Sequence, residues 1–138
     1  MKLYIDGGCC GLNQKDISKR SMISVVTDEN GKLLIDKSNH GGSNNIAEFI
    51  ALEDAIDYAL RNKKKKVKIV TDSTNNIAWF NRDDTQHKAK KAILRLDDPE
   101  WYQAIKGRLE QLKKYIEVDL EWIGREDNLA GKYIEENY

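Results

Sequence analysis

Residues 3–10 read LYIDGGCC, and this stretch decides how the rest of the chain is interpreted. Residues 2–6 have the composition of a short apolar β-strand, and the strand is expected to end at Asp6 because Gly7 and Gly8 follow at once. A carboxylate gains nothing from a hydrophobic core. Asp6 is therefore expected to shape a turn, to cap a helix or to bind a metal ion.

The hydrophobic pattern of the remaining chain predicts a mixed sheet with helices. The pair Asn30-Gly31 predicts a hairpin turn between the second and third strands. Pro99 is the only proline, and it suits the first turn of a helix. The expected strands are residues 2–6, 22–27, 32–37, 67–72 and 115–123, and the expected helices are residues 45–62, 74–81, 99–114 and 129–136.

The strand predicted over residues 115–123 alternates between apolar and acidic side chains. Its acidic side chains are expected to face one way and its apolar ones the other. The apolar set is Ile116, Val118, Leu120 and Trp122.

Length and composition indicate one domain spanning residues 1–138. Apolar residues make up 40% of the chain and charged residues 33%, which indicates a soluble globular protein rather than a disordered one. The chain contains no apolar run of the roughly 20 residues that span a bilayer. The adjacent cysteines Cys9 and Cys10 are expected to be reduced thiols in a cytoplasmic protein.

The net charge of the chain is zero, but the charges are unevenly distributed. Residues 86–114 hold eight basic and four acidic side chains, a balance of +4, whereas residues 116–138 hold two basic and seven acidic ones, a balance of −5. A neutral chain can therefore still present a basic face to a polyanion.

Two further carboxylates are expected to lie near Asp6. Asp72 ends the strand predicted over residues 67–72, and the carboxyl ends of neighbouring parallel strands meet at one edge of a sheet. Ligands of open α/β sheets bind outside those strand ends. Glu48 lies in the expected first turn of the helix that begins near Asn45, and this turn should start close to the same edge.

Each of the three acids also has a purely structural interpretation. Asp6 could shape a turn at the two glycines, and Asp72 could cap the following helix. Glu48 could complete a capping box with Asn45. Three acids that converge on one edge would repel one another and raise their pKa values, however, so their convergence favours a site for Mg²⁺ or Mn²⁺.

Four motifs together resemble a ribonuclease H type 1 domain over nearly the whole chain: YIDGG (4–8), SNNIAE (43–48), IVTDS (69–73) and LEWIGREDNLAGKYIE (120–135). The resemblance implies an α/β fold in which a five-stranded mixed sheet of order 3-2-1-4-5 is flanked by helices. It also implies an enzyme that cuts the RNA strand of an RNA–DNA hybrid with two metal ions. Asp6 would bridge both ions, and Glu48 and Asp72 would hold the second.

The resemblance further implies a set of nucleic-acid contacts. Asn44 and Asn45 match a pair of asparagines beside the scissile phosphate, and an amide can read a 2′-hydroxyl. The basic stretch 86–108 resembles a protrusion that binds the hybrid, although an ordinary solvated helix face would look the same. The other implied contacts are Gly7, Gly11, Asn13, Ser73, Asn75, Trp79, Arg125 and Asn128.

The last helix departs from the family pattern, which places a fourth carboxylate there as N-x-x-A-D. Here Asn128 matches, but Lys132 stands in the place of the aspartate, and the short loop before it has no histidine. A protonated lysine cannot bind a metal ion, so several interpretations stay open. Water, Asp127 or Glu136 completes the shell of two metal ions, Lys132 supplies catalytic charge beside a single ion, or the chemistry is lost. Lys132 could also simply point into solvent.

We therefore expect a monomeric endoribonuclease that depends on Mg²⁺ or Mn²⁺ and acts on RNA–DNA hybrids, with no membrane association and no obligate protein partner. The alternative is a catalytically weak or inactive module that binds nucleic acid. Another nuclease of the same superfold, such as a resolvase or integrase core, is disfavoured by the SNNIAE motif and by the small single domain.

Overall fold

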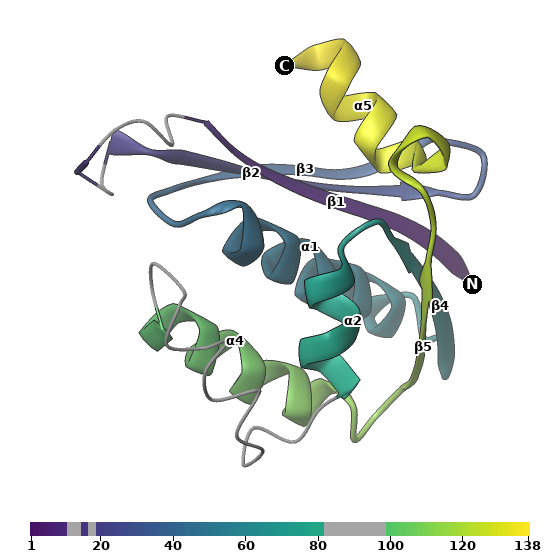
Figure 1. Ribbon diagram of the computed structural model, residues 1–138. Coiled ribbons are helices and arrows are strands. Elements are labelled where there is room, and N and C mark those ends of the chain that lie inside the picture. The colour runs from purple at the N-terminus through teal and green to yellow at the C-terminus, as the bar shows by residue number, and fades with distance from the viewer. Residues whose placement is uncertain (11–14, 17–18, 82–98) are drawn as a thin grey trace.

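The computed structural model describes residues 1–10, 15–16, 19–81 and 99–138 and shows a five-stranded sheet with helices on both faces (Figure 1). The strands are β1 (Lys2–Cys10), β2 (Ser21–Asp28), β3 (Leu33–His40), β4 (Lys66–Thr71) and β5 (Glu117–Trp122). The helices are α1 (Asn44–Arg61), α2 (Thr74–Asn81), α4 (Pro99–Leu112), the 3₁₀-helix η2 (Arg125–Asp127) and α5 (Leu129–Asn137).

The sheet has the order β3-β2-β1-β4-β5, which confirms the predicted fold class. The first three strands form an antiparallel meander, and β4 and β5 run parallel to β1. The predicted hairpin turn is present: Gly31 has a φ of 82°, and the Asp28 carboxylate accepts hydrogen bonds from the N–H groups of Asn30 and Lys32.

The helices divide the structure into layers. Helices α1, α2 and α4 lie on one side of the sheet, and α5 covers the other side over β1 and β2 (Figure 1). The main core lies between the sheet and α1, with Ile105 and Leu109 of α4 closing its outer side. A smaller core under α5 contains Ile23, Val25 and Ala130. Within the described residues, none of the helices combines the length and apolarity of a membrane span.

Strand β1 is longer than the sequence predicts. Its pairing with β2 continues past Asp6 and Gly7 as far as Cys10, which lies opposite Ser21. The prediction that the strand ends at Asp6 is therefore wrong, and the two glycines form no turn. Asp6 lies within a regular strand, so the turn interpretation of its carboxylate is wrong as well.

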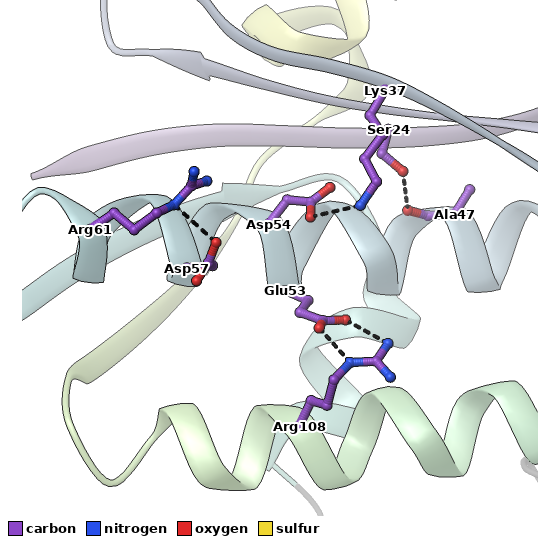
Figure 2. Close-up of polar contacts among 8 residues, drawn as sticks. All are labelled: Ser24, Lys37, Ala47, Glu53, Asp54, Asp57, Arg61 and Arg108. Atoms are coloured by element: carbon purple, nitrogen blue, oxygen red, sulfur yellow. Dashed lines mark hydrogen bonds and ion pairs between the residues drawn. The ribbon is translucent and has the colours of Figure 1, made fainter.

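Gly7 is required because α1 crosses β1 at this residue. A Cβ atom added to Gly7 would lie 2.3 Å from the carbonyl carbon of Ala47 and 2.4 Å from the backbone nitrogen of Glu48. Ser24, which pairs with Gly7 across the strands, donates a hydrogen bond of 3.3 Å from its Oγ to the Ala47 carbonyl (Figure 2). The missing side chain lets the helix approach the strand closely and brings Glu48 onto the sheet.

Charged side chains fix α1 to its neighbours on both sides (Figure 2). Lys37 of β3 lies 3.3 Å from the Asp54 carboxylate. Arg108 of α4 donates two hydrogen bonds, of 2.6 and 3.1 Å, to the carboxylate of Glu53. A bidentate pair of this kind is more specific in geometry than a single contact, and it sets how α4 lies along α1.

The C-terminal helix is fastened to β3 by two tyrosines. The hydroxyl groups of Tyr133 and Tyr138 donate hydrogen bonds of 2.9 and 2.6 Å to the two oxygens of the Asp36 carboxylate. These contacts hold the C-terminal half of α5 against the antiparallel strands β1 to β3. The packing leaves the start of α5 at the centre of the sheet, beside β1 and β2.

The alternation predicted for the last strand is confirmed only in part. Ile116 is buried, and the half-buried Val118 and Leu120 pack against the main core. Trp122 belongs to the same alternating set, but 54% of its surface is exposed. It is the last residue of a strand at the edge of the sheet, where the core no longer covers it.

Gly7→Ala is expected to lower the free energy of unfolding by about 3 kcal/mol, because the added methyl group would collide with the backbone of α1. Urea denaturation followed by circular dichroism measures the change. Gly8→Ala is the matched control, since no atom lies within 4 Å of its added Cβ. Equal unfolding midpoints for the two variants would contradict the close approach of α1 and β1.

Candidate metal-binding site

Three carboxylates meet at the carboxyl end of β4. In the described part of the chain, Asp6, Glu48 and Asp72 each offer an oxygen that lies within 4.8 Å of the other two. The three acids line a cleft, and the other residues lining it are Gly7, Gly8, Asn44, Arg125 and Ile134. Clustered carboxylate oxygens are the ligands that hard divalent cations such as Mg²⁺ and Mn²⁺ prefer.

Strand register explains why the two aspartates meet. Strands β1 and β4 run parallel, and Lys2 pairs with Lys68 as Tyr4 pairs with Val70. The same offset places Asp6 of β1 beside position 72, one residue beyond the end of β4. Glu48 reaches the two aspartates from α1, because the absence of a side chain at position 7 lets that helix lie close to the sheet.

Other side chains perform the capping that was considered for these acids. Ser43 is the N-cap of α1, and its Oγ accepts a hydrogen bond from the Ile46 N–H. Glu48 lies beyond the first turn of that helix, so the prediction of a capping box with Asn45 is wrong. At the start of α2, the Oγ of Ser73 accepts a hydrogen bond from the backbone N–H three residues later. Ser73 therefore performs the capping role that was considered for residue 72.

The cluster is electrostatically costly without a cation. Burial raises the pKa of Asp6 to about 6; a hydrogen bond with Glu48 opposes the rise, and the charge of Asp72 adds to it. Burial, followed by the charge of Asp6, raises the pKa of Glu48 well above its usual range. The Oε2 of Glu48 is also buried without a hydrogen-bond partner among the described residues. A divalent cation would remove both penalties, so this set of residues fits one.

Two buried asparagines hold the acids in place. The Nδ2 of Asn128 donates to the Ile5 carbonyl at 2.9 Å and to Oδ2 of Asp72 at 3.1 Å, while its Oδ1 caps α5. The Nδ2 of Asn76 donates to the Glu48 carbonyl at 3.0 Å. Because Asn128 is fully buried, its geometry supports a positioning role, whereas the predicted nucleic-acid contact would need an exposed side chain.

Helix α5 turns a glycine toward the cluster. A Cβ atom added to Gly131 would lie 3.2 Å from Oδ2 of Asp6. Lys132 is exposed and is not among the residues that line the cleft. Asp127 and Glu136 are exposed as well, and neither belongs to the carboxylate group. The helix therefore presents an open position, and neither of the two acids considered as a fourth ligand joins the carboxylate group.

Arg125 supplies a positive charge at the cleft. It lines the cleft from η2, and its guanidinium group slightly offsets the rise in the pKa of Asp6. Its Nε lies 3.7 Å from Oε1 of Glu135 on α5, an exposed ion pair that is worth little to stability. A guanidinium group beside clustered acids is suited to hold a phosphate at the same place.

The structure locates some of the other predicted nucleic-acid contacts. Asn44 lines the cleft, and its Oδ1 accepts a hydrogen bond of 2.8 Å from the Cys9 N–H. The Nδ2 of Asn75 donates to Oδ1 of Asn45 at 2.9 Å, which joins α1 and α2 beside the cleft. The predicted contacts that fall outside the described residues are Gly11, Asn13, the side chain of Trp79 and residues 86–98 of the basic stretch.

Three residues of the site were not predicted. Gly131 and Ile134 lie three and six residues after the N-cap of α5, on the helix face that meets the cleft. The sequence held a signal for both, because residues three apart on a helix share a face. Asn76 gave no such signal, since its role depends on how α2 packs against α1.

Comparisons with known proteins agree with this geometry. The sequence model of the RNase H family matches residues 1–130. A search of curated proteins gave no significant match. At 17% identity and a TM-score of 0.62, the N-terminal RNase H domain of Mycobacterium tuberculosis Rv2228c, solved as a fusion with maltose-binding protein, aligns over 98% of this chain and 93% of that one.

Two other solved structures show the same architecture. RNase H1 from the halophilic archaeon Halobacterium salinarum NRC-1 is 16% identical, with a TM-score of 0.59 over 98% of this chain and 97% of that chain. LC11-RNase H1, solved in complex with an RNA/DNA hybrid, is 20% identical, with a TM-score of 0.54 over 92% and 87%. At these identities the likeness establishes the shared fold.

Without metal ions, Asp6→Asn is expected to raise the free energy of unfolding near pH 7.5 but not near pH 4. The pKa of Asp6 lies at about 6 in the folded protein against an ordinary value of 3.8. The stability contributed by its bound proton is present below the ordinary pKa and is lost as the pH rises through about 6. Removing the charge should restore on the order of 1–3 kcal/mol near pH 7.5.

Urea denaturation in the presence of a chelator, at both pH values, measures this difference. Asp127→Asn, which neutralises an exposed carboxylate outside the cluster, is the control. Addition of Mg²⁺ should then stabilise the unmodified protein more than the Asp6→Asn variant. A variant that is less stable than the unmodified protein near pH 7.5 without metal would contradict the proposed repulsion among the acids.

Asn128→Ala is expected to lower the free energy of unfolding by about 2–4 kcal/mol, because it removes the cap of α5 and leaves the buried Ile5 carbonyl without a donor. Asn137→Ala is the control, since Asn137 is exposed and donates only to the nearby Tyr133 carbonyl. Urea denaturation compares the two. A loss for Asn128→Ala no larger than for Asn137→Ala would rule out the structural role of Asn128.

Proposed function

Because this chain belongs to the RNase H family, we propose that it is a metal-dependent endoribonuclease that hydrolyses the RNA strand of RNA–DNA hybrids. A structure with the same fold was solved in complex with an RNA/DNA hybrid, which supports this substrate class. The family match supports the general activity, and the arrangement of the cleft supports its catalytic use here.

The convergence of three carboxylates carries the proposal. Asp6, Glu48 and Asp72 come from three separate segments, and each offers an oxygen within 4.8 Å of the other two. This arrangement raises the pKa values of Asp6 and Glu48 and leaves a buried Glu48 oxygen without a hydrogen-bond partner among the described residues. Capping is performed by Ser43 and Ser73, so the acids are not needed for that purpose. A cation-binding role accounts for why the buried Glu48 and the two half-buried aspartates lie together.

These three carboxylates would hold Mg²⁺ or Mn²⁺. A bound divalent cation activates water for attack on a phosphodiester and stabilises the leaving oxygen. Asn128 holds a carboxylate oxygen of Asp72 in position, and Asn76 holds the backbone of Glu48. Glu48 is buried and the two aspartates are half-buried, and this partial removal of water strengthens electrostatic interactions in the cleft.

Other residues of the cleft would hold the nucleic acid. Arg125 is placed to donate hydrogen bonds to a phosphate oxygen beside the acids. The amide of Asn44 lines the same cleft and can bond a 2′-hydroxyl, which distinguishes RNA from DNA. Asn45 and Asn75, which are hydrogen-bonded to each other, would contact the nucleic acid on the α2 side of the cleft. Ser73, at the start of α2, would contact it there as well.

The second candidate function is a module that binds the hybrid without cutting it. One observation favours it: in the described part of α5, the position that meets Asp6 is Gly131, so the helix supplies no fourth carboxylate. A weakened metal site would leave the basic and polar residues able to bind nucleic acid. Binding and cleavage must therefore be measured separately.

A cleavage assay on labelled RNA–DNA hybrid tests the proposal, with single-stranded RNA, double-stranded RNA and double-stranded DNA as controls. Cutting of the hybrid is expected with Mg²⁺ or Mn²⁺ and not with chelator. Asp72→Asn should reduce the rate by about a hundredfold or more, because it removes one ligand from the cation. Hybrid binding without cleavage in either metal would support the second candidate instead.

The same assay decides the role of Lys132. Because its side chain is exposed and does not line the cleft, Lys132→Ala should keep the rate within about twofold. A loss comparable to that of Asp72→Asn would show that the ammonium group acts directly on the reaction. In that case Lys132 would supply a catalytic charge, and the interpretation that its side chain simply points into solvent would be wrong.

We also propose that the protein acts as a monomer in a reducing compartment such as the cytoplasm. Cys10 is an exposed free thiol in the structure, which suits such a compartment. The metal ligands all come from one chain, so a second copy is not needed to complete the cluster. Sedimentation analysis of the purified protein would measure its oligomeric state.

A further inference from the structure

Trp122 is a large aromatic side chain that lies exposed beside the carboxylate cluster. Its sequence pattern predicts that it should face the same way as Val118 and Leu120, yet 54% of its surface is exposed. The register of β4 and β5 pairs Trp122 with Thr71, the residue just before Asp72. Neighbouring strands lie about 4.8 Å apart, so the indole is one strand away from a proposed metal ligand.

The indole is held in a defined orientation. Its Nε1–H donates a hydrogen bond of 3.2 Å to the backbone carbonyl of Asp72. The next residue, Ile123, donates from its N–H to the Thr71 carbonyl at 3.0 Å, which extends the ladder to the end of the strand. A side chain that is already ordered loses little conformational entropy when something binds to it.

We infer that Trp122 is a substrate-contacting residue, whose exposed indole packs against a sugar ring of the nucleic-acid strand that has its phosphate at the carboxylates. The inference rests on the proposed function, since it needs a phosphodiester in the cleft. The polar end of the indole is used up by the Asp72 carbonyl, so the exposed part is apolar and flat. Sugar rings are the apolar surfaces that lie next to each phosphate in a duplex.

The position of Trp122 extends the line of groups along this end of the sheet. Asp6 lies on β1, Asp72 follows β4 and Trp122 ends β5, and these three strands are neighbours in the order β1-β4-β5. A strand of nucleic acid that has a phosphate at the two aspartates and runs toward β5 would pass over the indole.

Binding of a labelled RNA–DNA hybrid, followed by fluorescence anisotropy in chelator at fixed low salt, tests the inference. Trp122→Ala is expected to raise Kd about tenfold, because burial of the exposed indole face against an apolar surface contributes that order of affinity. Trp122→Phe keeps a ring and should raise Kd less. Tyr115→Ala is the matched control, since Tyr115 is an exposed aromatic residue before the opposite end of β5.

A second measurement reports on Trp122 in the unmodified protein and needs a variant only to assign its signal. The protein labelled with 5-fluorotryptophan gives a fluorine resonance for each tryptophan, and the one missing in Trp122→Phe belongs to Trp122. This resonance is expected to shift when hybrid is added in chelator. The proposed contact predicts the shift whether or not the hybrid can be cut.

The two measurements separate contact from positioning. If the indole serves only to hold Asp72, Trp122→Ala will lower kcat while Kd stays unchanged, and the Trp122 resonance of the unmodified protein will not shift when hybrid is added. That result overturns the inference. It leaves the proposed function intact, because the unmodified protein still binds and cuts the hybrid. A protein that neither binds nor cuts the hybrid would overturn the proposed function, and the inference with it.

Discussion

The close approach of α1 to β1 at Gly7 is the constraint on which the site depends. A Cβ atom at this position would lie 2.3 Å from the helix backbone, so any other residue would push the helix away. Ser24 completes the crossing, because its hydroxyl group satisfies the Ala47 carbonyl under the helix. The result is that Glu48, a residue of the helix, reaches the carboxylates of the sheet. A packing requirement of the core thus determines the position of a chemical group.

The same arrangement makes the protein less stable than its core alone would allow. Burial and the neighbouring carboxylate charges raise the pKa values of Asp6 and Glu48. One oxygen of Glu48 also has no hydrogen-bond partner among the described residues. Polar contacts in the surroundings offset part of this cost: Asn128 bonds Asp72 and joins β1 to α5, and Asn76 bonds the helix backbone. Destabilising groups held by a rigid scaffold are typical of sites that bind a cation or a charged substrate.

The last helix shows that a sequence motif does not by itself decide which side chain meets the site. Lys132 stands in the place of an expected aspartate when the letters are aligned, and it was therefore considered for a catalytic role. In the folded chain the residue that meets Asp6 is Gly131, and Lys132 is exposed. One position along a helix changes direction by about 100°, so the side chain that enters a cleft depends on how the helix is seated. The contacts of Tyr133 and Tyr138 with Asp36 contribute to that seating.

The sequence by itself determined the element order, the sheet order inferred through the family motifs, and the identity of the three acids, because these depend on local periodicity and on residue types at fixed spacing. It did not determine that β1 continues through Asp6, that Ser43 and Ser73 cap the helices, or that Trp122 is left exposed. Those features depend on contacts between segments far apart in the chain. Only the tertiary structure decides which side chain a neighbouring element covers, because burial is a property of packed layers and local pattern records only the tendency toward it.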